Sequence, residues 1–240
     1  GTRYLLINYM YIMKYEYYYN RVPGQEPWRN NLIYTSLISE DKKTFVQWYH
    51  NDSEYHKGQN EVVDQELMND KWSRELCWLS YMSTWAPECV PRILDINLTE
   101  RKIYLEIDGP DFWQRSLDAN CSFDDILPDW QEQMLAIIQK HHELGLYKYS
   151  MHPSSYFIID GKLKSINYFF TYKDDEGPIS IADHLSHIHS NRQQQMKQYT
   201  DQLGISWTDP QPLDLLEQLC WDSFSNMYPA DFIEKAKCIK

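Results

Sequence analysis

Residues 144–161 read LGLYKYSMHPSSYFIIDG, a stretch that joins a helix end to a loop and a hairpin. Just before it, Trp130 to Leu144 carries apolar residues at helical spacing. Within and after it, the β-rich runs Tyr156 to Ile159 and Leu163 to Ile166 flank Asp160-Gly161. Asp-Gly between two such runs is a strong signal for a two-residue hairpin turn. The pattern predicts a long helix, a short loop and a tight hairpin, in that order.

The chain before this stretch is predicted to be rich in strands. Leu32 to Ser39 and Thr44 to His50 are β-rich runs separated by a charged turn. Ile93 to Ile96 and Ile103 to Ile107 form a second pair of this kind. Between the two pairs, Glu61 to Ser83 has apolar residues at helical spacing. We therefore expect two hairpins with one helix between them.

The chain after the stretch is predicted to be helical. From Ile181 onward, Ile181 to Gln202 and Pro212 to Met227 read as helices. Asp108-Gly109-Pro110 interrupts the pattern and is the expected joint between an N-terminal lobe (2–107) and a C-terminal lobe (108–240). Strands followed by helices predict an α+β fold. The first lobe should be small, antiparallel and β-rich, and the second mainly helical.

Composition limits the classes of partner. The formal net charge is -12, which argues against a nucleic-acid partner because phosphates require a Lys/Arg surface. The apolar run from Tyr4 to Tyr19 is too short and too polar to span a bilayer. The cysteines are odd in number and scattered, which favours free thiols in a reducing compartment and predicts a cytoplasmic protein: Cys77, Cys89, Cys121, Cys220 and Cys238.

The quoted stretch resembles the protein-kinase-like superfamily, specifically its aminoglycoside and choline kinase-like phosphotransferases. In that family a long helix leads to a loop of the form H-x-D-x-x-P-x-N, followed by a strand, a tight turn, a strand and a metal-binding Asp. Pro153 matches the loop proline. The resemblance covers roughly Leu32 to Leu185. It implies a two-lobed kinase-like fold whose helical C-terminal lobe is truncated.

The resemblance also assigns positions upstream and downstream of the loop. Glu75 matches the helix Glu that pairs with a strand lysine. Glu106, Ile107 and Asp108 match the hinge, where backbone groups usually meet adenine. Asp183 matches the structural Asp that braces the catalytic loop. A nucleotide cleft between the lobes is implied by these positions together.

The charged groups of phosphoryl transfer are replaced in this alignment. Trp48 stands at the strand-lysine position, Ser150 at the catalytic Asp, Ser155 at the loop Asn and Asn167 at the metal Asp, with Tyr168 next. Phosphoryl transfer needs a group for the ATP phosphates, carboxylates for magnesium and an Asp for the acceptor hydroxyl. We therefore expect neither a metal site nor a bound cofactor, and expect the bulk of Trp48 and Tyr168 to fill the cleft.

Three functions stay open at this point. The first is a pseudokinase that serves as a binding or regulatory module. The second is a divergent phosphotransferase that uses ATP and magnesium on a small hydroxyl or amine, with Asp174, Asp175 and Glu176 as relocated acids. The third is a structural or assembly protein. In the first and third, a protein partner would cover the cleft or the helical lobe.

Several single residues have a simpler interpretation. Lys148 stands where the family has His, and a solvent-facing lysine is expected. Glu75 is as easily a solvated helix residue. Ser150 and His152 are too close in sequence to face each other as nucleophile and base. A histidine-rich group lacks the i, i+4 spacing of zinc helices and is expected to be a partly buried face: Asp183, His184, His187 and His189.

Overall fold

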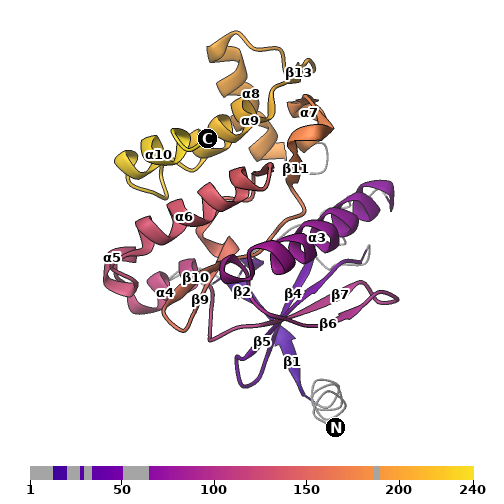
Figure 1. Ribbon diagram of the computed structural model, residues 1–240, viewed down its shortest axis with the longest axis vertical. Coiled ribbons are helices and arrows are strands. Elements are labelled where there is room, and N and C mark those ends of the chain that lie inside the picture. Colours follow the sequence, from indigo (N-terminus) through magenta and orange to yellow (C-terminus); the bar gives the residue numbers. More distant parts are fainter. Residues whose placement is uncertain (1–12, 21–27, 30–33, 51–64, 186–189) are drawn as a thin grey trace.

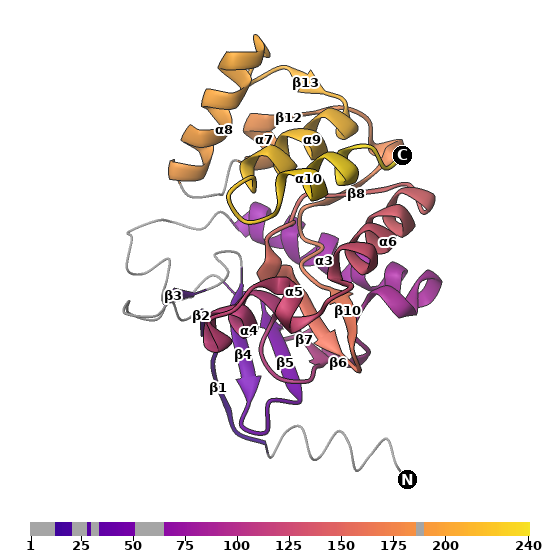
Figure 2. The ribbon, with the colours of Figure 1, turned by 90° about the vertical axis from the view of Figure 1, so that its left-hand side faces the viewer.

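The computed structural model describes residues 13–20, 28–29, 34–50, 65–185 and 190–240. The fold is α+β, as the order of elements predicts. The strands of the main sheet lie at one end of the molecule and the C-terminal helices lie at the other (Figure 1). A view from the side shows the same separation, with the long helix α3 between the two ends (Figure 2).

The main sheet has the strand order β1-β4-β5-β7-β6, and every neighbouring pair is antiparallel. Its strands are β1 (Tyr15–Tyr17), β4 (Thr35–Ser39), β5 (Thr44–Trp48), β6 (Ile93–Asn97) and β7 (Lys102–Glu106). A separate ribbon pairs β2 (Tyr19–Asn20) with β3 (Trp28–Arg29). Side chains alternate across β5: Phe45 belongs to the main core, whereas Val46 packs with Tyr104 on the other face.

Helix α3 (Gln65–Trp85) follows β5 and ends just before Pro87, where the short 3₁₀ helix η1 (Pro87–Cys89) begins. The helix predicted within Glu61 to Ser83 is thereby confirmed over its described part, and it ends before a proline, which cannot continue a helix. Its buried apolar residues follow the spacing of one helix face: Met68, Trp72, Leu79 and Met82. Two ionisable side chains, Lys71 and Glu75, are buried on the same helix.

Three helices follow the segment 107–110. They are α4 (Phe112–Ala119), α5 (Phe123–Ile126) and α6 (Trp130–Glu143). The Asp111 side chain caps α4 by accepting a hydrogen bond from the Gln114 N–H at 2.8 Å. A capping box between Ser122 and Asp125 starts α5. Helix α6 matches the predicted range to within one residue, and it leads directly to the loop and hairpin quoted above.

The predicted hairpin is present as β9 (Tyr156–Ile159) and β10 (Lys162–Ser165), which turn at Asp160-Gly161. Both turn residues have positive φ, 51° and 71°, as a tight turn of this kind requires. The 3₁₀ helix η2 (Pro153–Ser155) precedes the hairpin. A second ribbon pairs β8 (Leu146–Lys148) with β11 (Thr171–Lys173), and η3 (Asp174–Glu176) follows β11.

The described parts of the helix predicted from Ile181 to Gln202 are α7 (Ile181–Leu185) and α8 (Ser190–Leu203), and 186–189 lie outside the described residues. The helix predicted from Pro212 to Met227 is α9 (Leu213–Ser223), which ends earlier, at Ser223. The remaining elements are β12 (Ile179–Ser180), β13 (Pro210–Gln211) and α10 (Ala230–Lys237). None of the helices in the described ranges combines the length and apolar character that crossing a membrane requires.

Candidate functional site

Asn167 is the centre of a buried set of neutral side chains at the sheet side of the hairpin. Its Oδ1 accepts hydrogen bonds from the Tyr34 hydroxyl at 2.5 Å and from Gln47 Nε2 at 3.2 Å, and its Nδ2 donates to Ser155 Oγ at 2.8 Å. Its φ of 67° lies in the left-handed region, which Asn tolerates better than most residues. We call Tyr34, Gln47, Ser155 and Asn167 the amide network.

The strand position facing this network is Gln47 rather than Trp48. Alternation along β5 turns Trp48 to the opposite face, where its ring lies 4.0 Å from the His50 ring and 4.5 Å from Lys102 Nζ. The prediction that Trp48 faces Glu75 is therefore wrong by one residue. A register error of one residue reverses the face of a strand side chain. The group that reaches Asn167 from β5 is a neutral amide.

Glu75 is completely buried, so its interpretation as a solvated residue is wrong. Its Oε2 accepts hydrogen bonds from the Tyr49 hydroxyl at 3.1 Å and the Phe169 N–H at 2.9 Å. Burial raises the pKa of this carboxyl to about 7, and hydrogen bonds to Gln47 and Tyr49 oppose the shift. No ion pair with a described Lys or Arg fixes Glu75 on this helix.

The loop before the hairpin brings Ser155, but not Ser150, to Asn167. Pro153 is buried at the start of η2, and His152 Nδ1 caps this turn by accepting from the Ser154 N–H at 3.0 Å. The Ser150 hydroxyl is buried and has no hydrogen-bond partner among the described residues. His152 Nδ1 also lies 2.8 Å from Ser154 Oγ, so its described partner is Ser154 rather than Ser150.

Lys148 is fully buried, contrary to the expectation of a solvent-facing lysine. Its ammonium donates to the Ser150 carbonyl and lies 5.5 Å and 5.6 Å from the ring centroids of Tyr156 and Tyr168. Burial lowers the pKa of Lys148 to about 7. Burial also keeps the pKa of nearby His141 well below its usual value. We call Glu75, His141, Lys148 and Tyr168 the titratable core.

Tyr168 does not fill a cleft beside the sheet as expected. Its hydroxyl lies 2.9 Å from His141 Nε2 on α6, and its side chain is completely buried. The aromatic side chains that close the space between sheet and hairpin are instead Phe45 and Phe157, with ring centroids 5.1 Å apart, and Tyr18, 5.7 Å from Phe45. We call Tyr18, Phe45 and Phe157 the aromatic plug.

The aromatic plug is tied to the start of α4. Tyr18 donates its hydroxyl hydrogen to Asp111 Oδ2 at 2.8 Å, and Phe157 forms an isolated β-bridge with Asp111. Asp111 is completely buried, and burial raises the pKa of its carboxyl to about 7. A single buried acid therefore joins Tyr18, which directly follows β1, to Phe157 of the hairpin.

The predicted hinge positions are engaged with other parts of the chain. The Ile107 N–H donates to the Lys43 carbonyl at 2.9 Å. Glu106 forms a two-pronged ion pair with Arg92, and Asp108 pairs with Lys43 on the surface. The Arg115 guanidinium donates to the carbonyls of Asp108, Pro110 and Ile158, which fastens the segment to the hairpin.

The candidate relocated acids point to other partners. Glu176 binds the Arg74 guanidinium at 2.8 Å, and Asp175 pairs with Lys173 at 3.0 Å. The Asp174 carboxylate lies against Gly145, where a Cβ atom would come within 2.9 Å of it. Among the described residues, no hydrogen bond joins these three acids to the amide network.

The predicted bracing residue Asp183 and His184 both lie on α7, and His184 lies beside Tyr172 of β11. Asp183 accepts a hydrogen bond from Ser180 Oγ at 2.5 Å, and the His184 ring lies 4.7 Å from Tyr149 in the loop. His187 and His189 lie outside the described residues. Within the described ranges, three or more His, Cys, Asp or Glu side chains nowhere gather in a way that could hold a metal ion.

No protein-family model and no curated protein sequence matches the chain. The site residues that the sequence interpretation missed are Tyr18, Tyr34, Phe45, Gln47 and Phe157. Strand alternation could have found Gln47 and Phe45, because both share the buried face of β5. Tyr34 and Tyr18 carried no such signal, since their hydrogen bonds join residues 133 and 93 positions apart.

Proposed function

We propose that this chain is a kinase-like protein that has lost phosphotransferase chemistry and serves as a protein-binding or regulatory module. The observation that carries the proposal is the amide network. Ser155 and Asn167 stand where the resemblance implies a magnesium ligand and the metal Asp, and Gln47, the neighbour of Trp48, is the β5 residue that reaches Asn167. Both the oxygen and the nitrogen of the Asn167 side chain are hydrogen-bonded to other members of the network. Magnesium favours charged oxygen ligands, and this set supplies none.

Two further features support the proposal. The aromatic plug brings Phe45 of the sheet into contact with Phe157 of the hairpin beside residues 107–111, where an adenine would have to enter. At the same place, the Arg115 guanidinium donates a hydrogen bond to the Asp108 carbonyl, and the Ile107 N–H donates one to the Lys43 carbonyl. A nucleotide would have to displace packed rings and break these backbone hydrogen bonds before it could bind.

A thermal-shift assay with and without ATP and magnesium tests the proposal. A ligand that does not bind the native state cannot stabilise it, so the melting temperature should not move. ATP with EDTA in place of magnesium is the matched control. A shift that requires both ATP and magnesium and grows with ATP concentration would overturn the proposal.

The competing phosphotransferase function is tested by turnover rather than binding. ATP hydrolysis and transfer should be absent against a panel of amino alcohols and sugars. If turnover is seen, the triple change D174N/D175N/E176Q decides whether those acids carry it. Turnover that disappears in this variant, while its melting temperature stays unchanged, would establish the competing function in place of ours.

A further inference from the structure

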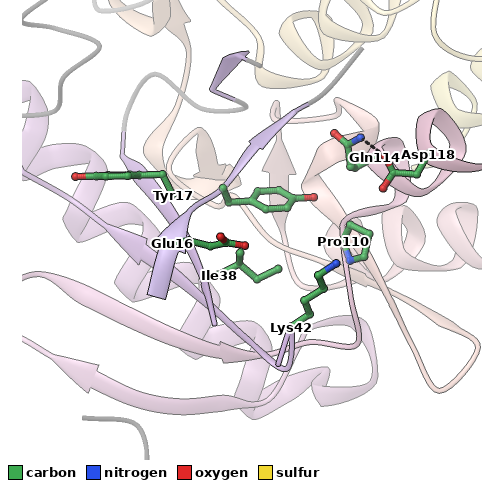
Figure 3. A pocket seen from close by; sticks show the side chains of 8 residues that line it. Glu16, Tyr17, Ile38, Lys42, Pro110, Gln114 and Asp118 are labelled. Atoms are coloured by element: carbon green, nitrogen blue, oxygen red, sulfur yellow. Dashed lines mark hydrogen bonds between the residues drawn. The ribbon is translucent and has the colours of Figure 1, made fainter. Parts of the chain in front are cut away.

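A cavity of about 210 Å³ lies on the solvent side of the aromatic plug, with Tyr18 common to both. Figure 3 shows its side chains arriving from β1, from β4 and the turn after it, and from Pro110 and α4. The cavity is lined by Glu16, Tyr17, Tyr18, Ile38, Lys42, Pro110, Gln114 and Asp118. Pockets that hold drug-sized ligands have volumes of about 300–1,000 Å³, so this smaller cavity suits one side chain rather than a nucleoside.

Two carboxylates stand on different walls of this cavity. Glu16 comes from β1 and Asp118 from α4, 102 residues later in the chain. Among the described residues, neither lies within 4.0 Å of a Lys, Arg or His nitrogen. Asp118 Oδ1 is oriented by a hydrogen bond from the buried Gln114 amide at 2.7 Å (Figure 3). The cavity therefore offers two carboxylates, one of them oriented by a hydrogen bond, and neither forms an ion pair with a described residue.

Aromatic surface completes the lining. Tyr17 is 46% exposed, which is unusual for a large side chain, and Tyr18 is held in place by its hydrogen bond to Asp111. The face of a tyrosine ring attracts a cation within about 6 Å of its centroid. Carboxylates beside aromatic rings, on a chain of net charge -12, select a cation and disfavour an anion.

We propose that this cavity receives an arginine side chain of a partner polypeptide, an inference that rests on the proposed binding role. A guanidinium has five N–H donors in a planar fork, so it can bond to carboxylates on two walls and stack on a ring at once. An ammonium is a compact point charge without this planar fork, so it fits two walls and a ring face less well. The apolar contacts from Ile38 and Pro110 suit the aliphatic stem of the same side chain.

Replacing Lys42 tests the proposal, because it should change the affinity for arginine in the opposite direction to replacing a carboxylate. It lines the same cavity, and Figure 3 shows its side chain extending toward Pro110. Its ammonium would repel an incoming guanidinium. Removing this charge should strengthen binding, whereas removing either carboxylate should weaken it. A change in folding alone would not produce opposite effects from neutral substitutions at residues that line the same cavity.

The experiment measures fluorescence anisotropy of a labelled Gly-Gly-Arg-Gly-Gly peptide with the full chain at low salt. The neutral isostere with citrulline in place of arginine is the matched control, and a lysine peptide is the second. We expect Glu16→Gln and Asp118→Asn each to weaken binding about threefold, the double variant about tenfold, and Lys42→Gln to strengthen it about twofold. The lysine peptide should bind more weakly than the arginine peptide.

Equal binding of the arginine and citrulline peptides, or unchanged binding in the double variant with an unchanged melting temperature, would overturn the proposal. Free ethylguanidinium that binds as tightly as the peptide would overturn the polypeptide part of it. The result is separate from the nucleotide test. A magnesium-dependent ATP shift removes the proposed function even if the peptide binds, and failure of the peptide leaves an absent ATP shift untouched.

Discussion

The amide network and the titratable core are neighbouring buried polar regions that differ in how their polar groups are stabilised. In the amide network every described side chain is neutral, and Asn167 uses both its oxygen and its nitrogen. In the titratable core, Lys148 has only a backbone carbonyl and two aromatic rings around its ammonium. Buried polar groups cost little when hydrogen-bonded, whereas buried charges cost much unless paired.

The difference indicates which region controls the response of the protein to pH. The network has no ionisable member except Tyr34 and meets the titratable core at the hydrogen bond between Gln47 and Glu75. The hydrogen bonds that Asn167 makes should be insensitive to pH around neutrality. The core holds Glu75 and Lys148, whose pKa values both lie near 7 because of burial. Their charges favour each other, yet no direct contact joins them. Changes that charge the network or neutralise the core test this contrast.

The largest expected effect comes from charging the network with Asn167→Asp. An ionised carboxylate there would keep the donors Tyr34 and Gln47 but would face no cation, and Ser155 would lose its donor. An uncompensated buried charge costs about 4 kcal/mol, so the free energy of unfolding should fall by that amount at pH 7. Urea denaturation at pH 7 and pH 5 measures it, and the loss should shrink at pH 5 as the carboxyl protonates.

The double variant Gln47→Lys, Asn167→Asp sharpens this result. If the site can still hold an ion pair between positions 47 and 167, the added lysine should recover more than half of the stability that Asn167→Asp loses. A double variant that is less stable than the sum of the single changes would show that the site can no longer accommodate an ion pair. In either case the exposed change Asp118→Asn serves as a control with little effect on stability.

Neutralising the core with Lys148→Met should stabilise the protein by about 3 kcal/mol at pH 7. The folded pKa of Lys148, about 7, lies below its ordinary 10.5. Between these values the unfolded chain binds an additional proton, so wild-type stability rises with pH from about 7 to 10. The variant should lose this rise. Lys235→Met, an exposed lysine, is the control, and a less stable Lys148→Met at pH 7 would contradict the argument.

The contrast between the two regions also marks what could be predicted from the sequence. The loop and hairpin around Pro153 and Asp160-Gly161 follow from local signals, and they appear where expected. The burial of Lys148 does not follow from such signals, because lysine is rarely buried unless paired. It results from the packing of β8 against α6, which directly precedes it, and against α9, which comes much later in the chain.

The error at Trp48 has a different origin. The hairpin of β4 and β5 was predicted correctly, but the face on which each side chain lies depends on single-residue register. The alignment to a family position was set by the charged turn rather than by the buried face of the strand. Phe45, Gln47 and Tyr49 share that face, and this alternation identifies Gln47 once the core is known.

A smaller effect is expected from Glu75→Gln, about 2 kcal/mol of added stability at pH 8. The folded pKa of Glu75, about 7, is raised above its ordinary 4.5. Its contribution is therefore fully present below pH 4.5 and is lost as pH rises through 7. The variant should lose less stability than wild type between pH 5 and 8, measured by urea denaturation. Asp111 acts in the same direction, so part of the wild-type slope should remain.

The smallest effect tests whether the network is as complete as its hydrogen bonds indicate. Ser155→Ala removes the acceptor of Asn167 Nδ2 and leaves a buried donor without a partner. Loss of one such neutral hydrogen bond costs about 1 kcal/mol, with no dependence on pH between 5 and 9. Ser150→Ala is the matched control in the same loop, because the Ser150 hydroxyl is buried without a described partner and its removal should be neutral or slightly stabilising. A loss of stability in Ser155→Ala that depends on pH would mean that titration of the core changes the hydrogen bonds of the network. The contrast between the two regions would then be wrong.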